Sequence, residues 1–149
     1  MAEHPEFENF ENLQAYFGSR IYEILEKKNL VMAGWEEIIM KKDEEGRWVP
    51  NQDFLGKDML PYVWNSIYEN LDQGNRLANA GFPVILCNVN NFYFDLAYSH
   101  HPAERGLYWG GFVNTRSAFD FAPYDVFKST LEDKWGNPYE IQKDFKGMT

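Results

Sequence analysis

The segment from residue 61 to residue 87, PYVWNSIYENLDQGNRLANAGFPVILC, decides the fold. It begins with a short apolar run at residues 62–64, opened by Pro61, and ends with a run of branched apolar side chains at residues 84–87. Between them, residues 65–79 carry apolar side chains at helical spacing. A strand, a helix and a strand in this order predict a βαβ unit, in which the strands are parallel and the crossover is right-handed.

The residues before this unit extend the same pattern. Residues 8–28 carry apolar side chains every three or four positions, which predicts an amphipathic helix. The apolar run at residues 30–33, ended by Gly34, is typical of a strand that is buried on both faces of a sheet. A helical turn is expected over residues 36–40, and a charged loop over residues 41–47. The chain is therefore expected to have an α/β fold with about three parallel strands.

The second half of the chain has a different character. Residues 90–149 are dense in Gly, Pro, Asn and aromatic side chains, with short helical patterns only around residues 115–121 and 124–131. A loop region of this length is usually functional or supported by structure elsewhere. The 149 residues suffice for one hydrophobic core, but they are too few for a complete (β/α)₈ barrel, which needs about 250.

Charge and composition argue against several classes of function and structure. The formal net charge of −9 argues against a nucleic-acid partner. No stretch approaches the roughly 18 apolar residues of a membrane span, and the opening MAEHPEFENF lacks the apolar core of a signal peptide. The single cysteine, Cys87, excludes an internal disulfide framework but does not determine the compartment. His100 and His101 are adjacent and lack metal-ligand spacing, so neither a metal nor a cofactor is expected.

Aromatic side chains make up 17% of the residues, and a bulky core accounts for most of them. Five residues, however, fall at strand ends or beyond: Trp35 follows the first expected strand, Trp64 ends the second, Tyr93 and Asp95 follow the third, and Trp109 lies in the loop region. Because parallel strands end at one edge of a sheet, these side chains are expected at a common rim. They either cap the core or form an aromatic-walled pocket with one carboxylate, which suits a polyhydroxylated ligand.

The chain resembles the β-N-acetylhexosaminidases of glycoside hydrolase family 20 in four runs that occur in order: VMAGWEEI (31–38), YVWN (62–65), NFYFDLAY (91–98) and GLYWGGFVNTRSAFDFAPYDVF (106–127). The resemblance implies a (β/α)₈ barrel that removes terminal N-acetylglucosamine or N-acetylgalactosamine from glycans with retention. In this family the substrate's own acetamido oxygen attacks the anomeric carbon. A Glu acts as general acid and base, and the Asp before it orients the acetamido nitrogen.

The resemblance also implies roles for the five residues. Trp35 and Trp64 would be walls of the acetamido pocket, and the Tyr93 hydroxyl would donate a hydrogen bond to the acetamido oxygen. Asp95 would bind sugar hydroxyls away from the reacting carbon. Trp109 would stack on the sugar at the leaving-group side.

The family's H-x-G-G-D-E motif, which carries the catalytic Asp-Glu pair, does not occur in the sequence, and neither do the Trp and Glu of the last barrel strand. Residues 1–149 are therefore expected to correspond to roughly strands five to seven of a larger catalytic barrel. We expect the isolated chain to contain no catalytic residue and to be inactive. Alternatives are a non-catalytic carbohydrate-binding or interaction module that uses the same aromatic rim, and a structural fragment without ligand affinity.

Three strands alone would leave open sheet edges and an uncovered inner face. These surfaces are expected to be covered by the remainder of the parent barrel, by a second copy of the chain, or by the C-terminal segment folding back. The expected ligand is a glycan that contains N-acetylhexosamine. A secreted or periplasmic parent enzyme is compatible with the resemblance.

Overall fold

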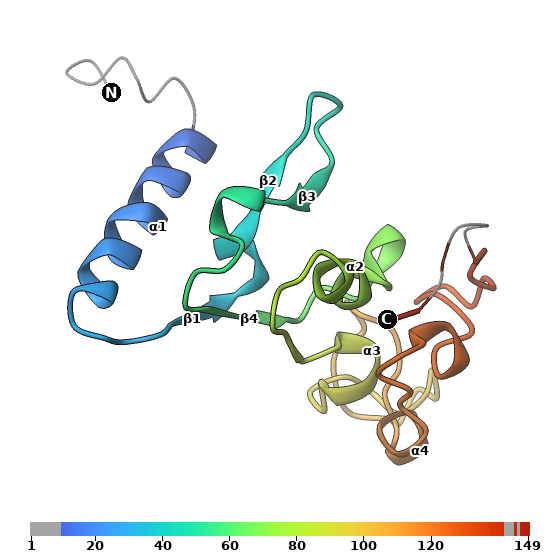
Figure 1. Cartoon of the computed structure of the whole chain (residues 1–149). Helices are drawn as coiled ribbons and strands as arrows, with labels where there is room; N and C mark the ends of the chain where they lie inside the picture. Colours follow the sequence, from blue (N-terminus) through green and yellow to red (C-terminus); the bar gives the residue numbers. More distant parts are fainter. Residues whose placement is uncertain (1–9, 142–144, 146) are drawn as a thin grey trace. The chain divides into compact units, whose positions relative to one another are not determined.

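The computed structural model describes residues 10–141, 145 and 147–149. The chain divides into two compact units, Met1–Pro61 and Tyr62–Thr149, and the division falls within strand β4. Figure 1 labels the main helices and strands of both units. Among the described residues, no helix combines the length and the apolar character that crossing a membrane requires.

Helix α1, Phe10–Glu26, confirms the amphipathic helix expected over residues 8–28, of which residues 8 and 9 lie outside the described part. The helix ends in a Schellman motif. Asn29 adopts the left-handed conformation with φ 54°, its amide donates to the Glu26 carbonyl over 2.9 Å, and the Leu30 amide donates to the Leu25 carbonyl over 3.0 Å. This cap explains why the helical pattern stops before the next strand.

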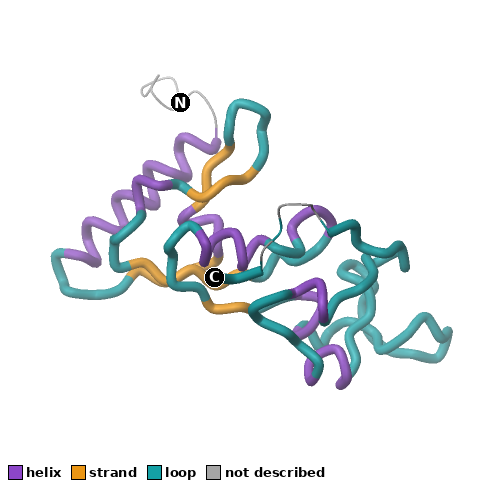
Figure 2. The backbone as a smooth tube through the Cα atoms, turned by 45° about the vertical axis from the view of Figure 1, so that its right-hand side comes forward, coloured by secondary structure: helices purple, strands orange, loops and turns teal. Residues whose placement is uncertain are grey.

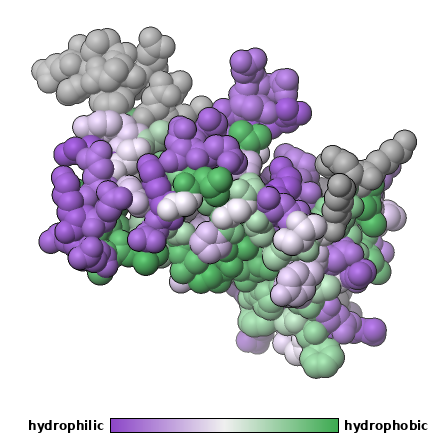
Figure 3. Space-filling view, viewed as in Figure 1, coloured by the Kyte–Doolittle hydropathy of each residue, from purple (hydrophilic) through white to green (hydrophobic). Residues whose placement is uncertain are grey.

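Strand β1, Met32–Trp35, starts two residues later than the apolar run predicts. The expectation that this run is buried on both faces is wrong for this chain. Met32 is buried, but Ala33 is exposed, and so are Leu30 and Val31 just before the strand. Apolar side chains are correspondingly visible among the polar ones on the surface (Figure 3). The 3₁₀ turn η1, Glu36–Ile39, confirms the helical turn expected after the strand.

The charged loop expected over residues 41–47 is shorter in the structure, because Lys41 and Lys42 belong to a strand and residues 43–47 form the tip of a small antiparallel hairpin. Strand β2, Met40–Lys42, pairs with strand β3, Trp48–Pro50, and Lys41 is opposite Val49. The strands are three residues long and β2 contains two lysines, so the period-two alternation that marks a strand is missing. A second 3₁₀ turn, η2 at Gln52–Phe54, follows the hairpin.

Strand β4, Met59–Val63, and strand β5, Ile85–Leu86, confirm the parallel pair at the centre of the predicted α/β fold. Tyr62 is opposite Ile85 and Val63 is opposite Leu86, and the strand order in the sheet is β1-β4-β5. Pro61, which was expected to open the strand, lies within β4 instead.

The helix between these strands is shorter than expected. Residues 65–79 form the 3₁₀ turn η3, Tyr68–Asn70, and then helix α2, Gln73–Asn79. A glycine in a helix costs about 1 kcal/mol relative to Ala. Gly74, however, is buried, and a Cβ atom at this position would lie only 2.4 Å from Leu86 Cδ2. The glycine therefore allows α2 to pack closely against β5.

The chain beyond β5 is mostly loop, as Figure 2 shows in teal. It contains helix α3, Val89–Phe92, helix α4, Thr115–Phe119, and the 3₁₀ turn η4, Val126–Lys128. The last two confirm the helical patterns expected around residues 115–121 and 124–131, whereas α3 was not predicted. Val89, Leu96 and Val113 form one buried cluster in the core of this unit.

The C-terminal residues fold back within the second unit. The Asn79 side chain, at the end of α2, donates to the Gly147 carbonyl over 2.6 Å and accepts a hydrogen bond from the Thr149 amide over 2.8 Å. The Met148 amide donates to the Tyr124 carbonyl over 2.7 Å. The last three residues are thereby attached to the end of α2 and to the loop before η4.

Candidate functional site

The parallel pairing of β4 and β5 continues beyond the strands and aligns the segments that follow them. The Cys87 amide donates to the Val63 carbonyl over 2.8 Å, and the Val89 amide donates to the Trp64 carbonyl over 3.2 Å. Cys87, expected inside a strand, is half-buried directly after β5. These bonds hold the start of α3 beside Trp64.

A pair of side chains reinforces this alignment. The Ser66 hydroxyl donates to Asn90 Oδ1 over 2.6 Å, and Ser66 is buried. The two residues are 24 positions apart in the sequence, so no local pattern marks them. The bond links the segment after β4 to helix α3, and the sequence did not indicate this role for either residue.

A second parallel contact brings the loop around Trp109 to Asp95. The Leu107 amide donates to the Asp95 carbonyl over 2.8 Å, and the Ala97 amide donates to the Leu107 carbonyl over 3.0 Å. Gly106 makes this close approach feasible, because it has φ 128° and a Cβ atom there would lie only 2.6 Å from the Ala97 nitrogen. The glycine determines how near Trp109 can come to Asp95.

Four of the five predicted binding residues form one cluster, in which Trp64, Tyr93 and Asp95 gather around the Trp109 ring. Its centroid lies 5.6 Å from that of Tyr93 at an interplanar angle of 78°, and 6.4 Å from that of Trp64 at 60°. The Trp109 indole nitrogen donates to Asp95 Oδ2 over 3.3 Å. The Tyr93 contact is edge-to-face and the Trp64 contact is tilted, and contacts of this kind stabilise an aromatic cluster. Trp64 and Tyr93 also pack against the core, and Trp109 is 37% exposed.

Trp35, the fifth predicted residue, belongs to the first unit. It is the last residue of β1 and is 52% exposed. The next residue, Glu36, is buried at the start of η1. The structure thus places Trp35 at the end of a strand, as expected, in a different unit from the four clustered residues.

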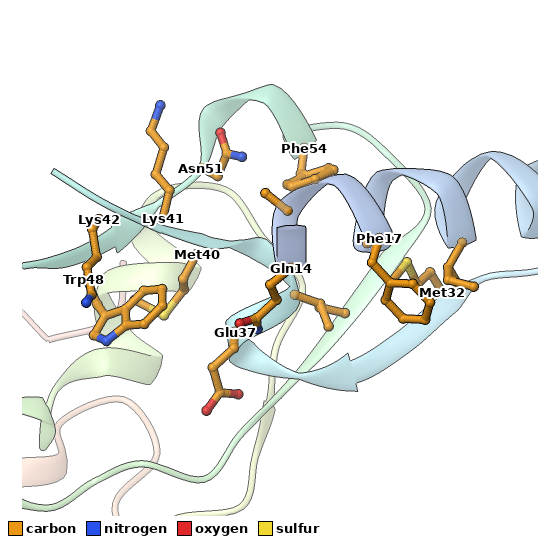
Figure 4. A pocket seen from close by; sticks show the side chains of 14 residues that line it. Gln14, Phe17, Met32, Glu37, Met40, Lys41, Lys42, Trp48, Asn51 and Phe54 are labelled. Carbon is orange, nitrogen blue, oxygen red and sulfur yellow. The ribbon is translucent and has the colours of Figure 1, made fainter. Parts of the chain in front are cut away.

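The first unit contains a cavity of about 620 Å³ bordered by α1, β1 and the β2–β3 hairpin (Figure 4). Phe17, Met32 and Phe54 contribute apolar walls, and Glu37 and Lys41 contribute charged groups. None of the five predicted binding residues, all of which lie in the described part of the chain, borders this cavity. Within that part, no three His, Cys, Asp or Glu side chains gather where they could hold a metal ion.

A carboxylate and three aromatic rings at an accessible surface match the chemistry of saccharide binding, and the sequence comparison agrees. The profile of the glycosyl hydrolase family 20 catalytic domain matches residues 1–148. The chain belongs to this family. The family's catalytic domain is a barrel of alternating strands and helices, and the parallel strands with their crossover helix agree with part of such a barrel, so the predicted fold class is confirmed.

Several relatives of this family 20 chain are known as hexosaminidases. This chain is 31% identical over 120 residues to a beta-hexosaminidase of Vibrio vulnificus, and the aligned part makes up 79% of this chain and 14% of the relative. It is 26% identical over 121 residues to beta-hexosaminidase B of Pseudoalteromonas piscicida (77% of this chain, 14% of the relative). The N,N'-diacetylchitobiase of Vibrio harveyi is 26% identical over 151 residues (95% of this chain, 16% of the relative). The chain belongs to a glycoside hydrolase family and spans about one seventh of the length of these relatives.

Proposed function

We propose that this chain forms a saccharide-binding wall in the active site of a β-N-acetylhexosaminidase, which hydrolyses terminal N-acetylhexosamine from glycans with retention. The observation that carries the proposal is the cluster of Trp64, Tyr93 and Asp95 around Trp109. Its four members come from the sequence runs that resemble the family, and the hexosaminidase and chitobiase relatives support an N-acetylated sugar as the ligand.

Each side chain has a role that follows from its chemistry. Trp35 and Trp64 are proposed to enclose the acetamido group, and the Trp109 ring to stack on the apolar face of the sugar at the leaving-group side. The Tyr93 hydroxyl donates to the acetamido oxygen and holds it near the anomeric carbon, which makes an intramolecular attack effective. The Asp95 carboxylate accepts hydrogen bonds from sugar hydroxyls.

In the proposed reaction the acetamido oxygen forms a bond to the anomeric carbon while the glycosidic bond breaks. The leaving oxygen takes a proton from a glutamic acid, and water later opens the oxazolinium-type intermediate and returns a proton to that carboxylate. The motif that carries this Glu is not found in residues 1–149. We therefore propose that the isolated chain binds sugar without hydrolysing it.

We further propose that the chain corresponds to roughly strands five to seven of the catalytic barrel. The 14–16% share of the relatives' length and the three-stranded sheet support this assignment. So do exposed apolar side chains such as Leu30 and Val31 beside β1, which the remainder of the barrel or a second copy of the chain would cover.

Binding can be tested with the isolated chain by following the indole N–H signals in nuclear magnetic resonance spectra. The Trp109 signal is assigned by its loss in Trp109→Phe. N-acetylglucosamine is expected to move the Trp64 and Trp109 signals in a saturable way, and glucose, which lacks the acetamido group, to bind at least about tenfold more weakly, a difference of about 1.4 kcal/mol. Equal responses to both sugars would contradict an acetamido pocket.

Catalysis is tested separately. The isolated chain is expected to leave an aryl N-acetylglucosaminide intact, and robust turnover would contradict the absence of a general acid. In an intact parent enzyme, Tyr93→Phe is expected to lower kcat more than it raises KM, because the hydroxyl positions the nucleophile. If a complete parent binds sugar but shows no turnover, the result favours a non-catalytic carbohydrate-binding module.

A further inference from the structure

Residues 131–139 follow the last of the four sequence runs, within the part of the chain that the family profile matches, and form a tightly bonded turn. Glu132 and Pro138 form an antiparallel bridge, and the Tyr139 amide donates to the Leu131 carbonyl over 3.0 Å. The side chain of Asp133 fixes the tip by accepting hydrogen bonds from the backbone amides of Trp135 and Asn137, over 2.8 and 2.9 Å. A turn held in this way can present the residue at its tip, Lys134, in a defined position.

Lys134 joins three segments of the chain. Its ammonium group donates a hydrogen bond to the Trp109 carbonyl oxygen over 3.1 Å. It also lies over two aromatic rings, 4.8 Å from the centroid of Tyr68 and 4.7 Å from that of Trp135. Such cation–π contacts are attractive and favour this position of the ammonium group. Tyr68 itself has φ 53°, which is uncommon for a residue with a side chain, and it lies in the crossover between β4 and β5.

The backbone next to Trp109 lies directly against Lys134. Gly111 has φ 101°, and a Cβ atom there would be 3.2 Å from both Cα and Cβ of Lys134. On the other side, a Cβ atom at Gly110 would lie 2.5 Å from Val89 Cγ1, in the core. The Trp109 backbone is thus held between the core and the 131–139 turn.

We propose that Lys134 is a positioning residue that holds Trp109 in its saccharide-binding orientation by bonding its main-chain oxygen. Because the bond is made to the backbone, the ring stays available for a ligand. The part that concerns the saccharide rests on the proposed function, whereas the effect of Lys134 on Trp109 does not.

The test follows the indole N–H signal of Trp109 in two variants of Lys134. Lys134→Met keeps the length of the side chain but removes the charge and the donor, so the Trp109 signal is expected to shift or broaden. Lys134→Arg keeps the positive charge and the hydrogen-bond donor, so its Trp109 signal is expected at the position seen in the wild type. Lys128→Met is the matched control, because Lys128 is exposed and forms a surface ion pair with Asp125, over 3.2 Å. An identical Trp109 signal in Lys134→Met and Lys128→Met would overturn the proposal.

A variant of the aromatic partner keeps the proposal testable if Lys134→Met does not fold. Tyr68→Asn removes one of the rings that hold the ammonium, and Asn tolerates the positive φ at this position. It is expected to shift the Trp109 signal less than Lys134→Met but detectably, while the Trp35 and Trp48 signals of the first unit stay unchanged as a folding control. No shift of Trp109 in Tyr68→Asn would contradict the arrangement.

Sugar binding adds a second readout. Lys134→Met is expected to raise the Kd for N-acetylglucosamine about fivefold, and Lys134→Arg to stay within about twofold of wild type. If the wild-type chain binds no sugar, the proposed function fails, but the indole signals still decide whether Lys134 positions Trp109. If sugar binds equally well to all three chains, the saccharide part of the proposal is wrong.

Discussion

The indole nitrogen of Trp109 donates a hydrogen bond to Oδ2 of Asp95 over 3.3 Å, although 14 positions separate the two residues in the sequence. The bond links an aromatic ring and a carboxylate that are both proposed to contact a saccharide. A bond to a charged acceptor is stronger than one between neutral groups, and it also fixes the direction of the ring edge. The position of the ring therefore depends on the carboxylate.

Replacing Asp95 by Ala is expected to shift the Trp109 indole signal and to raise the Kd for N-acetylglucosamine about tenfold, which corresponds to about 1.4 kcal/mol. Asp95→Asn retains an oxygen acceptor and is expected to have a smaller effect on both. The control is Asp120→Ala, which removes a carboxylate that pairs with Arg116 on the surface of α4. Wild-type affinity and an unmoved indole signal in Asp95→Ala would show that the bond has no role.

Two glycines with positive φ test the approach of the Trp109 loop to Asp95. Gly106→Ala and Gly136→Ala both force a side chain into the left-handed region, at a cost of about 1–2 kcal/mol. At Gly106 the new Cβ would also clash with the backbone of Ala97, whereas nothing lies within 4 Å at Gly136. Gly106→Ala is therefore expected to lower the free energy of unfolding by a further 1–3 kcal/mol or so. Urea denaturation measures the difference, and equal midpoints for the two variants would refute it.

Replacement by Ala is expected to affect stability differently at the glycines of α1 and α2. A Cβ atom at Gly18 in α1 would meet nothing within 4 Å, so Gly18→Ala is expected to stabilise the helix by about 0.5–1 kcal/mol. Gly74→Ala gains the same propensity in α2 but displaces the Leu86 side chain, so no net gain is expected. Circular dichroism during thermal unfolding compares them, and a stabilisation of similar size in both variants would contradict the close packing of α2 on β5.

The 131–139 turn is expected to loosen in acid. The Asn137 side chain, which donates hydrogen bonds to the Asp133 carboxylate, is the main cause that lowers the pKa of Asp133 below its ordinary value of 3.8, and backbone amides add to it. A lowered pKa in the folded state means that the carboxylate contributes its full stabilisation above pH 3.8 and loses it as the pH falls below that value. Hydrogen exchange at the Trp135 amide is expected to accelerate over that range.

The matched variant for this prediction is Asp133→Asn, which keeps the shape of the side chain but cannot titrate in this range. In this variant, hydrogen exchange at the Trp135 amide is expected to be faster than in the wild type at neutral pH. The 131–139 turn of the variant is not expected to loosen further in acid. A wild-type exchange rate that follows only the intrinsic pH dependence of amides would show that the carboxylate does not hold the turn.

Helix α1 and the parallel pair β4–β5 were predictable because their apolar spacing is local and regular. The β2–β3 hairpin was not, since Lys41 and Lys42 interrupt the alternation of a strand that is only three residues long. The length of the crossover helix was also missed, because the positive φ of Tyr68 interrupts a helical pattern that continues in the sequence.

At the candidate site, strand-end positions indicated Trp64, Tyr93 and Asp95, and the structure brings all three to Trp109. The support from Lys134 could not be predicted, because its bond to Trp109 spans 25 positions and no motif surrounds it. Long-range hydrogen bonds to a backbone oxygen leave no pattern in the side chains.

Gly110 occupies the interior immediately beside a residue whose ring is open to solvent. A redesign of the Trp109 ring must therefore also accommodate Val89, because one peptide bond connects the proposed recognition surface to the hydrophobic interior. Conversely, if the proposed saccharide site is correct, substitutions of Val89 chosen only to improve thermal stability are expected to change ligand preference as well. In this chain, the proposed ligand selectivity and the thermal stability are therefore expected to change together.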